Sequence, residues 1–148
     1  MSVERRLSEL GLILPEVMQV PAGVRLPFRW VRVVGKRVTI SGHGPMLPDG
    51  SVAGPFGKVG QNVSPEQGYE AARLTALGIL ASLHREVGSL ENLTWLRVFG
   101  MVNAAAGFQS MPAVINGFSD LILSVFGPER VSTRVRRSAW PNCRSGSQ

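Results

Sequence analysis

A long run of apolar and polar positions in the middle of the chain predicts its principal helix. Ser64, Pro65 and Gln67 have the spacing of a helix start, in which a hydroxyl caps the first turn and proline takes the first helical position. Apolar or small residues then recur at intervals of three and four as far as Gly88, a residue type that commonly closes helices. The small residues predict close packing of this helix onto a sheet. They are Ala71, Gly78 and Ala81.

The segments on either side of this helix predict strands and a second helix. Phe28–Val34 and Arg37–Ser41 are rich in β-branched and aromatic residues around Gly35-Lys36, which is a hairpin pattern. Leu93–Val102 is an apolar run with one charge, as expected of a buried strand. A second helix is predicted from Ser110 to Gly127. Two helices on one face of a mixed β-sheet, an α+β fold, follow from this order.

The opposite face of such a sheet needs a cover that a chain of 148 residues does not contain. Oligomerisation supplies that cover most simply. The composition, with 44% hydrophobic and 18% charged residues, is that of a folded domain. No apolar run approaches the ~20 residues of a membrane span. Cys143 is the single cysteine and excludes an internal disulfide, so we expect a cytoplasmic protein.

The formal net charge of +6 is concentrated at one end of the chain. Residues 128–148 contain five arginines and one glutamate, whereas residues 1–127, here called the body, contain 11 cations and 9 anions. The body therefore has a net charge of only +2. Because nucleic-acid affinity depends on neutralising phosphates, and no basic stripe interleaved with aromatics is evident, nucleic acid is not an expected partner.

The loop Ser41–Pro45 follows the second strand of the hairpin and is the best candidate site. Two glycine amides, a hydroxyl and the imidazole of His43 suit a carboxylate or a small carbonyl compound, although the pattern by itself favours a plain turn at a strand end. Asn103 and Asn116 are open to two interpretations, local capping or ligand contact. No set of His, Cys, Asp and Glu has metal-ligand spacing, so we expect neither a metal nor another cofactor.

Three stretches of the chain together resemble the Rid (YjgF) family. They are SGHGP followed by DG, GKVGQNVSPEQGYEAARLTALGILASL, and VFGMVNAAAGFQSMPAVINGFSDLILSVFG. The match is best to its chorismate-mutase-like branch, whose members are named endoribonucleases. The resemblance implies a chorismate-mutase-like fold, and a homotrimer with ligand clefts between subunits. In well-known Rid members the cleft hydrolyses reactive enamines and imines from amino-acid metabolism, and an arginine binds the substrate carboxylate as a bidentate fork.

The resemblance also implies site residues. Ser41, Gly42 and Gly44 match the family's loop, with His43 where glutamine is usual. Asn103 and Asn116 fall in two further family segments. The arginine motif expected after the second helix is missing, and only Arg134 lies nearby, without its context.

The tail from Val131 to Gln148 differs from the body in composition. It carries four arginines, four serines and the only cysteine, without strand-like alternation. Codons exist that encode this tail in one reading frame and, with one G restored after the Arg130 codon, GLHARSAVGVAELPFGVA in the other, and that second string contains the missing arginine motif. We therefore predict a single domain over residues 1–130 and an aberrant basic tail over residues 131–148, produced by a one-base frameshift and disordered or non-native in sequence. A divergent basic tail is the alternative.

Three functions remain open from the sequence. The first is a hydrolytic deaminase of enamines and imines, inactive here if the arginine motif is truly lost. The second is a trimeric, non-catalytic binder of a small carboxylate. The third is a ribonuclease, which the low net charge of the body does not favour.

Overall fold

The structure is a computed structural model that describes residues 2–140, with the backbone alone described for residues 132–140. Its order of elements begins with a short helix and ends with a strand. The elements are α1 (Val3–Glu9), β1 (Val31–Val34), β2 (Arg37–Ile40), α2 (Pro65–Val87), β3 (Trp95–Asn103), α3 (Met111–Phe126), the 3₁₀ turn η1 (Pro128–Arg130) and β4 (Val131–Trp140).

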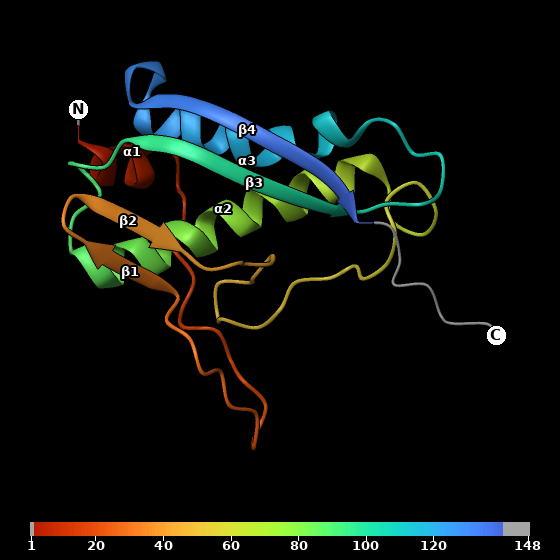
Figure 1. The fold of residues 1–148 in the computed structure, drawn as a ribbon, viewed down its shortest axis with the longest axis horizontal. Coiled ribbons are helices and arrows are strands. Elements are labelled where there is room, and N and C mark those ends of the chain that lie inside the picture. Colours follow the sequence, from red (N-terminus) through yellow and green to blue (C-terminus); the bar gives the residue numbers. More distant parts are fainter. Residues whose placement is uncertain (1, 141–148) are drawn as a thin grey trace.

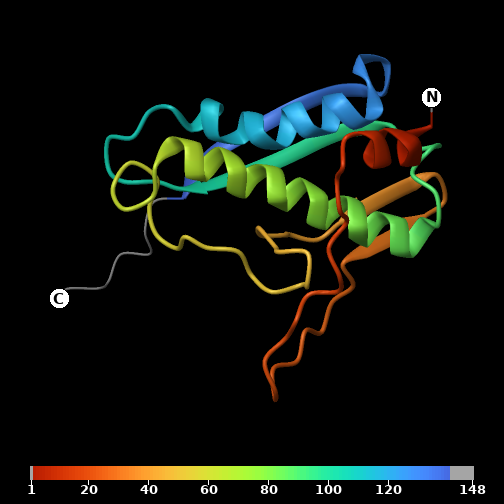
Figure 2. The ribbon, with the colours of Figure 1, turned by 180° about the vertical axis from the view of Figure 1, so that it is seen from behind.

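The two long helices form one layer and the strands lie on one side of it. Figure 1 shows the strands in front of α2 and α3, and Figure 2, from behind, shows the two helices in front. β1 and β2 cover the C-terminal half of α2, while β3 and β4 lie over α3 (Figure 1). The predicted α+β class, with two helices on one face of the strands, is confirmed.

The principal helix begins and ends where the sequence predicts. Ser64 Oγ accepts a hydrogen bond from the amide of Gln67, and the Gln67 side chain accepts one from the amide of Ser64, which completes a capping box. At the other end Gly88 has a φ of 77°, a left-handed conformation that glycine adopts without strain. Local capping therefore determines both ends of α2.

The prediction that Gly78 packs onto a sheet is wrong. A Cβ at this position would lie 3.1 Å from Met46 Cε, 3.8 Å from His43 Cδ2 and 3.9 Å from the carbonyl oxygen of Gly44. The glycine instead admits the loop that follows β2. A side chain here would crowd only the flexible end of Met46, because the two loop atoms would stay at ordinary contact distance.

The strands pair in two separate ladders in the described part of the chain. β1 and β2 are antiparallel, with Val31 opposite Ile40 and Val34 opposite Arg37. β3 and β4 are parallel, and α3 forms the connection between them. Buried side chains from both ladders, such as Val31 and Trp95, belong to the same core. The two ladders therefore cover one helical layer, although the single mixed sheet expected from sequence is divided.

The sequence analysis expected no final strand, and this expectation is wrong. The backbone of Val131–Trp140 forms β4, whose register places Val98 opposite Val135 and Asn103 opposite Trp140. Two reasons favour a strand here. β-Branched Val131, Thr133 and Val135 occupy alternate positions, and a crossover helix returns the chain beside β3. Residues 141–148 of the predicted aberrant tail lie outside the described residues, and the frameshift itself stays a prediction.

The core lies between the helical layer and the strands. Its largest fully buried side chains are Leu80, Leu90, Ile122, Val3 and Val125. The ring of Trp95 meets Phe118 edge-on at 5.7 Å and Phe126 at 5.8 Å, an arrangement that aromatic pairs favour. A smaller cluster around Val63, Val102 and Ile115 fills the other end of the layer.

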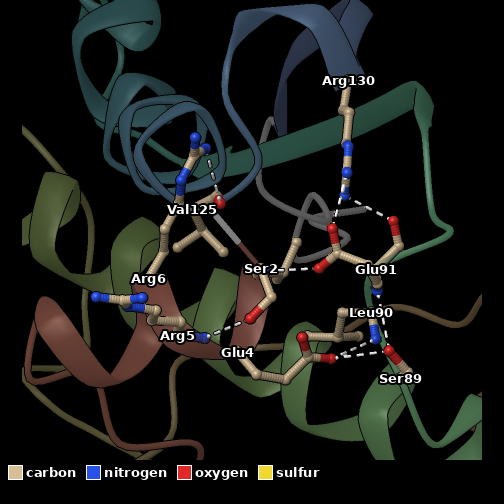
Figure 3. Close-up of polar contacts among 10 residues, drawn as sticks. Ser2, Glu4, Arg5, Arg6, Ser89, Leu90, Glu91, Val125 and Arg130 are labelled. Carbon is tan, nitrogen blue, oxygen red and sulfur yellow. Dashed lines mark hydrogen bonds and ion pairs between the residues drawn. The ribbon is translucent and has the colours of Figure 1, made fainter.

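Two carboxylates attach α1 to the connection between α2 and β3 (Figure 3). Glu4 Oε1 accepts the amide of Leu90 at 3.0 Å, and Glu91 Oε2 accepts the amide of Val3 at 2.7 Å. Arg130 donates to Glu91 Oε1 at 2.8 Å. The Val3 amide first, and then Arg130, hold the pKa of the Glu91 carboxyl below its usual value. A helix of seven residues, too short to be stable alone, is thus fixed by hydrogen bonds at its first turn.

The contact between α2 and α3 depends on Gly117, and replacing it with alanine should destabilise the protein. A Cβ at Gly117 would overlap the carbonyl group of Tyr69, which is backbone and cannot rotate away. We expect Gly117→Ala to lower the free energy of unfolding by about 2–3 kcal/mol in denaturant titrations, despite the better helix propensity of alanine. Exposed Asn116 on the same helix provides the control, since Asn116→Ala should change it by less than about 0.5 kcal/mol. Equal stabilities of the two variants would contradict this packing.

Candidate functional site

The loop Ser41–Pro45 is held between the hairpin and α2. The amide of Ser41 donates to the carbonyl oxygen of Trp30 at 2.9 Å, and Ser41 Oγ donates to that of Arg29 at 2.7 Å. The other side of the loop lies against Gly78 of α2. The conformation of the predicted loop is therefore fixed by main-chain bonds to the segment before β1.

His43 uses both ring nitrogens inside the protein. Nδ1 lies 2.8 Å from the carbonyl oxygen of Ser41, and Nε2 lies 2.8 Å from Ser82 Oγ. A carbonyl oxygen can only accept, so the proton is assigned to Nδ1. In the neutral ring Nε2 is then an acceptor for the Ser82 hydroxyl. This tautomer presents a basic nitrogen to a hydroxyl group.

Arg85 completes the hydrogen-bond chain. Its Nη2 donates to Ser82 Oγ at 3.3 Å, and its Nη1 donates to the carbonyl oxygen of Pro15 at 3.0 Å. Ser82 thus accepts from the guanidinium and donates to His43 Nε2. Both recorded partners of the guanidinium are uncharged, and none of the ion pairs among the described side chains involves Arg85. Its charge is therefore available to an anion.

The environment keeps the His43 imidazole neutral. Burial is the largest cause and lowers its pKa from the ordinary value of 6.5. The hydrogen bond to the Ser41 carbonyl favours the protonated ring and opposes this shift, while the charge of Arg85 adds to it. At neutral pH the ring is consequently a base with a free electron pair directed at Ser82.

These groups line a small pocket between α2 and the segments that flank the hairpin. Its open space is about that of one water molecule. The ring of Trp30 lies 4.9 Å from that of His43 and closes one side. The lining combines apolar with polar side chains. They are Met18, Trp30, His43, Met46, Ser82 and Arg85.

The structure brings some of the predicted site residues together and places others elsewhere. Ser41, Gly42, His43 and Gly44 share the loop beside the pocket. Asn103 donates through Nδ2 to the carbonyl oxygen of Gly57 at 2.9 Å, at the opposite end of α2. From Pro65, at that end, to Ser82 the helix extends about 25 Å. Within one subunit Asn103 is therefore not part of this pocket.

Two further predicted residues also lie outside the pocket. Asn116 is exposed on α3. Arg134 lies on β4, with its backbone opposite Arg97 of β3, and its side chain is outside what the structure describes. Neither position contradicts a role in a cleft shared between subunits.

Sequence reasoning missed Ser82 and Arg85, although a signal for them existed. Both lie on α2 three residues apart, a spacing that puts them on the same helical face. Ser82 is 6% exposed and interrupts an otherwise apolar run, which is unusual unless its hydroxyl has a buried partner.

In the part of the chain that the structure describes, no three side chains of His, Cys, Asp and Glu gather closely enough to hold a metal ion. None of the helices α1 to α3 has the length and hydropathy to span a membrane.

An α+β layer of this topology, with a loop of paired glycines after the first hairpin, is the chorismate-mutase-like architecture. The family model described as "YjgF/chorismate_mutase-like, putative endoribonuclease" matches residues 4–145. The chain belongs to this family, and the predicted resemblance is confirmed. The match includes most of the tail that the sequence analysis set apart.

Individual relatives agree with the family model. Protein TCP17 of Trypanosoma cruzi is 34% identical over 133 residues, which cover 86% of this chain and 76% of that protein. The crystal structure of a protein from Shewanella oneidensis, titled a putative endoribonuclease, superposes with a TM-score of 0.84 at 29% identity, covering 95% of this chain and 89% of that one. A protein of unknown function from Agrobacterium tumefaciens gives 0.75 at 30% identity, with 94% and 80% covered.

The proximity of Arg85 to His43 makes a prediction about titration. Arg85→Gln removes a cation that disfavours the imidazolium, so the pKa of His43 should rise relative to that of the unmodified protein. The pH dependence of the imidazole proton resonances measures this directly. Arg73→Gln is the matched control, because Arg73 lies on the same helix but pairs with Glu70. A His43 pKa at or above 6.5 in the unmodified protein would contradict the described environment.

Proposed function

We propose that this protein is a hydrolytic deaminase of small enamines and imines derived from amino acids. The observation that supports it is the neutral His43 imidazole, hydrogen-bonded through Ser82 to an arginine with no acidic partner, beside a small pocket. A base and a cation that both contact the Ser82 hydroxyl suit a substrate that carries both a carboxylate and a C=N bond. Family membership is consistent with this chemistry but does not specify it.

The proposed reaction needs one water and one proton path. An enamine first tautomerises to the imine. Water then adds to the C=N carbon, and its proton passes through the Ser82 hydroxyl to His43 Nε2. The imidazolium returns that proton to the nitrogen, which gives a carbinolamine. The hydroxyl proton of the carbinolamine then passes by the same path to the nitrogen while the C–N bond breaks, so that a keto acid and ammonia leave. The lowered pKa of His43 keeps the imidazole in the neutral form, which can accept a proton.

Arg85 is proposed as the group that binds the substrate carboxylate. The guanidinium carries five N–H donors, and two of its nitrogens bond to Pro15 and Ser82, so further donors remain for an anion. A bidentate arginine–carboxylate pair would orient the reacting carbon toward the loop. In this proposal Arg85 takes over the role that the sequence analysis could assign only to Arg134.

We further propose a homotrimer, because the face of β3 that points away from the helices exposes two large apolar side chains between Arg97 and Asn103. Phe99 is 54% and Met101 is 53% exposed in the single chain, on the strand face opposite buried Val102. Burying such a face between copies removes apolar surface from water. Subunit contacts would also enlarge the small pocket and could add Asn103, Asn116 or Arg134 from a neighbouring copy.

A ribonuclease is the second candidate, on the ground that the family description and the Shewanella protein's title both contain that activity. RNA cleavage that persists through rigorous repurification and disappears in His43→Ala would favour it over the deaminase.

Ammonia release from freshly generated 2-aminoacrylate tests the deaminase. His43→Ala should lower kcat by about 10²-fold or more, because it removes the acid–base group. Arg85→Gln should mainly raise KM, by about tenfold or more, since a hydrogen bond between charged groups is lost. Arg73→Gln should match the unmodified protein. If that protein binds a 2-keto acid but releases no ammonia above the uncatalysed rate, the non-catalytic binder is the better description.

Sedimentation equilibrium tests the trimer. The unmodified protein should sediment at three times its 16.0 kDa chain mass at micromolar concentration. Phe99→Asp should dissociate it, because the charge cannot be buried at low cost. Leu123→Asp changes a 40% exposed apolar residue on α3 and should leave the mass unchanged. A folded monomer for the unmodified protein would refute this assembly.

A further inference from the structure

Residues 15–19, here called the strap, form one wall of the pocket although they belong to no helix or strand. They follow α1 and pass the C-terminal part of α2 (Figure 2). Pro15 is buried, and Met18 is half-buried and lines the pocket. The carbonyl oxygen of Pro15 accepts a hydrogen bond from Arg85 Nη1 at 3.0 Å. The strap therefore contacts the candidate site through one side chain and one main-chain acceptor.

The tight turn that follows the candidate loop, residues 47–50, holds the strap in place. The amides of Glu16 and Gln19 donate to two main-chain carbonyl oxygens of this turn, those of Pro48 and Gly50, at 2.9 Å each. Gln19 Nε2 donates to a third carbonyl oxygen of the turn at 2.9 Å. These three hydrogen bonds fix the strap without any contribution from Arg85.

Gly50 allows the strap to lie directly on the turn. Its φ of 84° is left-handed, a conformation that glycine adopts without strain. A Cβ at this position would overlap the carbonyl oxygen of Val17 and would lie 3.3 Å from that of Glu16. Both oxygens belong to the main chain and can move away only if the strap moves. A side chain at position 50 would therefore displace the strap from the turn.

The strap restricts a side chain that is long and flexible. Arg85 is an exposed residue of α2, and holding an arginine in one rotamer costs conformational entropy. The Pro15 carbonyl oxygen and the Ser82 hydroxyl bind different nitrogens of the guanidinium, so the group is fixed at two points. Because the side chain is already ordered before an anion arrives, binding an anion loses less entropy.

We propose that the strap positions Arg85: the Pro15 carbonyl, fixed by the turn at Gly50, holds the guanidinium beside His43 in the orientation that binds a small carboxylate. The acceptor is a main-chain atom, so the path of the strap, and not a side-chain rotamer, determines where it points. Pro15 is thus a positioning residue that acts through Arg85. The proposal deepens the role of Arg85 proposed above and rests on it for the ligand, whereas the position of the guanidinium can be tested without one.

Titration of His43, followed by its imidazole proton resonances, tests that position. Arg85 is the charged group that lowers the pKa of His43, whereas the carboxylates of the strap and the turn, Glu16 and Asp49, are exposed. Gly50→Ala should raise this pKa, as is expected of Arg85→Gln, because displacing the strap releases the guanidinium. In an Arg85→Gln background it should raise the pKa no further, since both changes act through one group. A further rise there would show that the strap only shields the ring, and would overturn the proposal.

Pyruvate binding, measured by isothermal titration calorimetry, tests the consequence for a ligand. Gly50→Ala should raise Kd by about two- to tenfold, the range expected when one long side chain has to be ordered on binding. Gln19→Ala removes one of the three bonds to the turn and should raise Kd less. Equal Kd values for Gly50→Ala and the unmodified protein would refute the strap proposal alone. If the unmodified protein does not bind pyruvate, both this proposal and the carboxylate role of Arg85 are wrong.

Gly23→Ala is the matched control. Gly23 lies in the same connection between α1 and β1 and also has a φ of 84°, but no atom of the described residues lies within 4 Å of its Cβ position. This variant introduces the same backbone strain without displacing the strap, so it should leave both Kd and the pKa of His43 unchanged. An effect as large as that of Gly50→Ala would refute the proposal. If circular dichroism shows Gly50→Ala unfolded, the direction of both shifts in Gln19→Ala decides the test.

Discussion

The helical layer depends on how closely α3 can approach α2, and Gly117 sets that distance. Gly117 brings the backbone of α3 against Tyr69, so that the two long helices form one tight layer. A methyl group at this position would overlap backbone that cannot rotate away. At Gly78 the constraint is weaker, because a Cβ there would crowd only the flexible end of Met46, at 3.1 Å, and would meet His43 and Gly44 of the loop at ordinary contact distance. The helices and strands on this layer, and the candidate loop that lies on α2, therefore depend first on the contact at Gly117.

The position of the loop explains the chemistry available at the pocket. Because the loop lies directly on α2, His43 Nε2 reaches a hydroxyl from the middle of that helix, and the same hydroxyl reaches a guanidinium one turn later. Burial first, and then the nearby cation, keep the imidazole neutral, and a neutral imidazole gives the cation no counter-charge. The neutral state of His43 and the free charge of Arg85 therefore depend on each other, and this follows only from the positions of both residues.

The sequence by itself determined the features that depend on neighbours in the chain. The ends of α2, the turn at Gly35 between β1 and β2, and the apolar run of β3 follow from capping, turn chemistry and periodicity, and the motifs identified the family. It failed at β4, where pairing with a strand far away in sequence outweighed an unpromising composition. Only the tertiary structure could place Ser82 and Arg85 beside His43, and Asn103 away from it. Those separations depend on side-chain packing between elements, which no local pattern encodes.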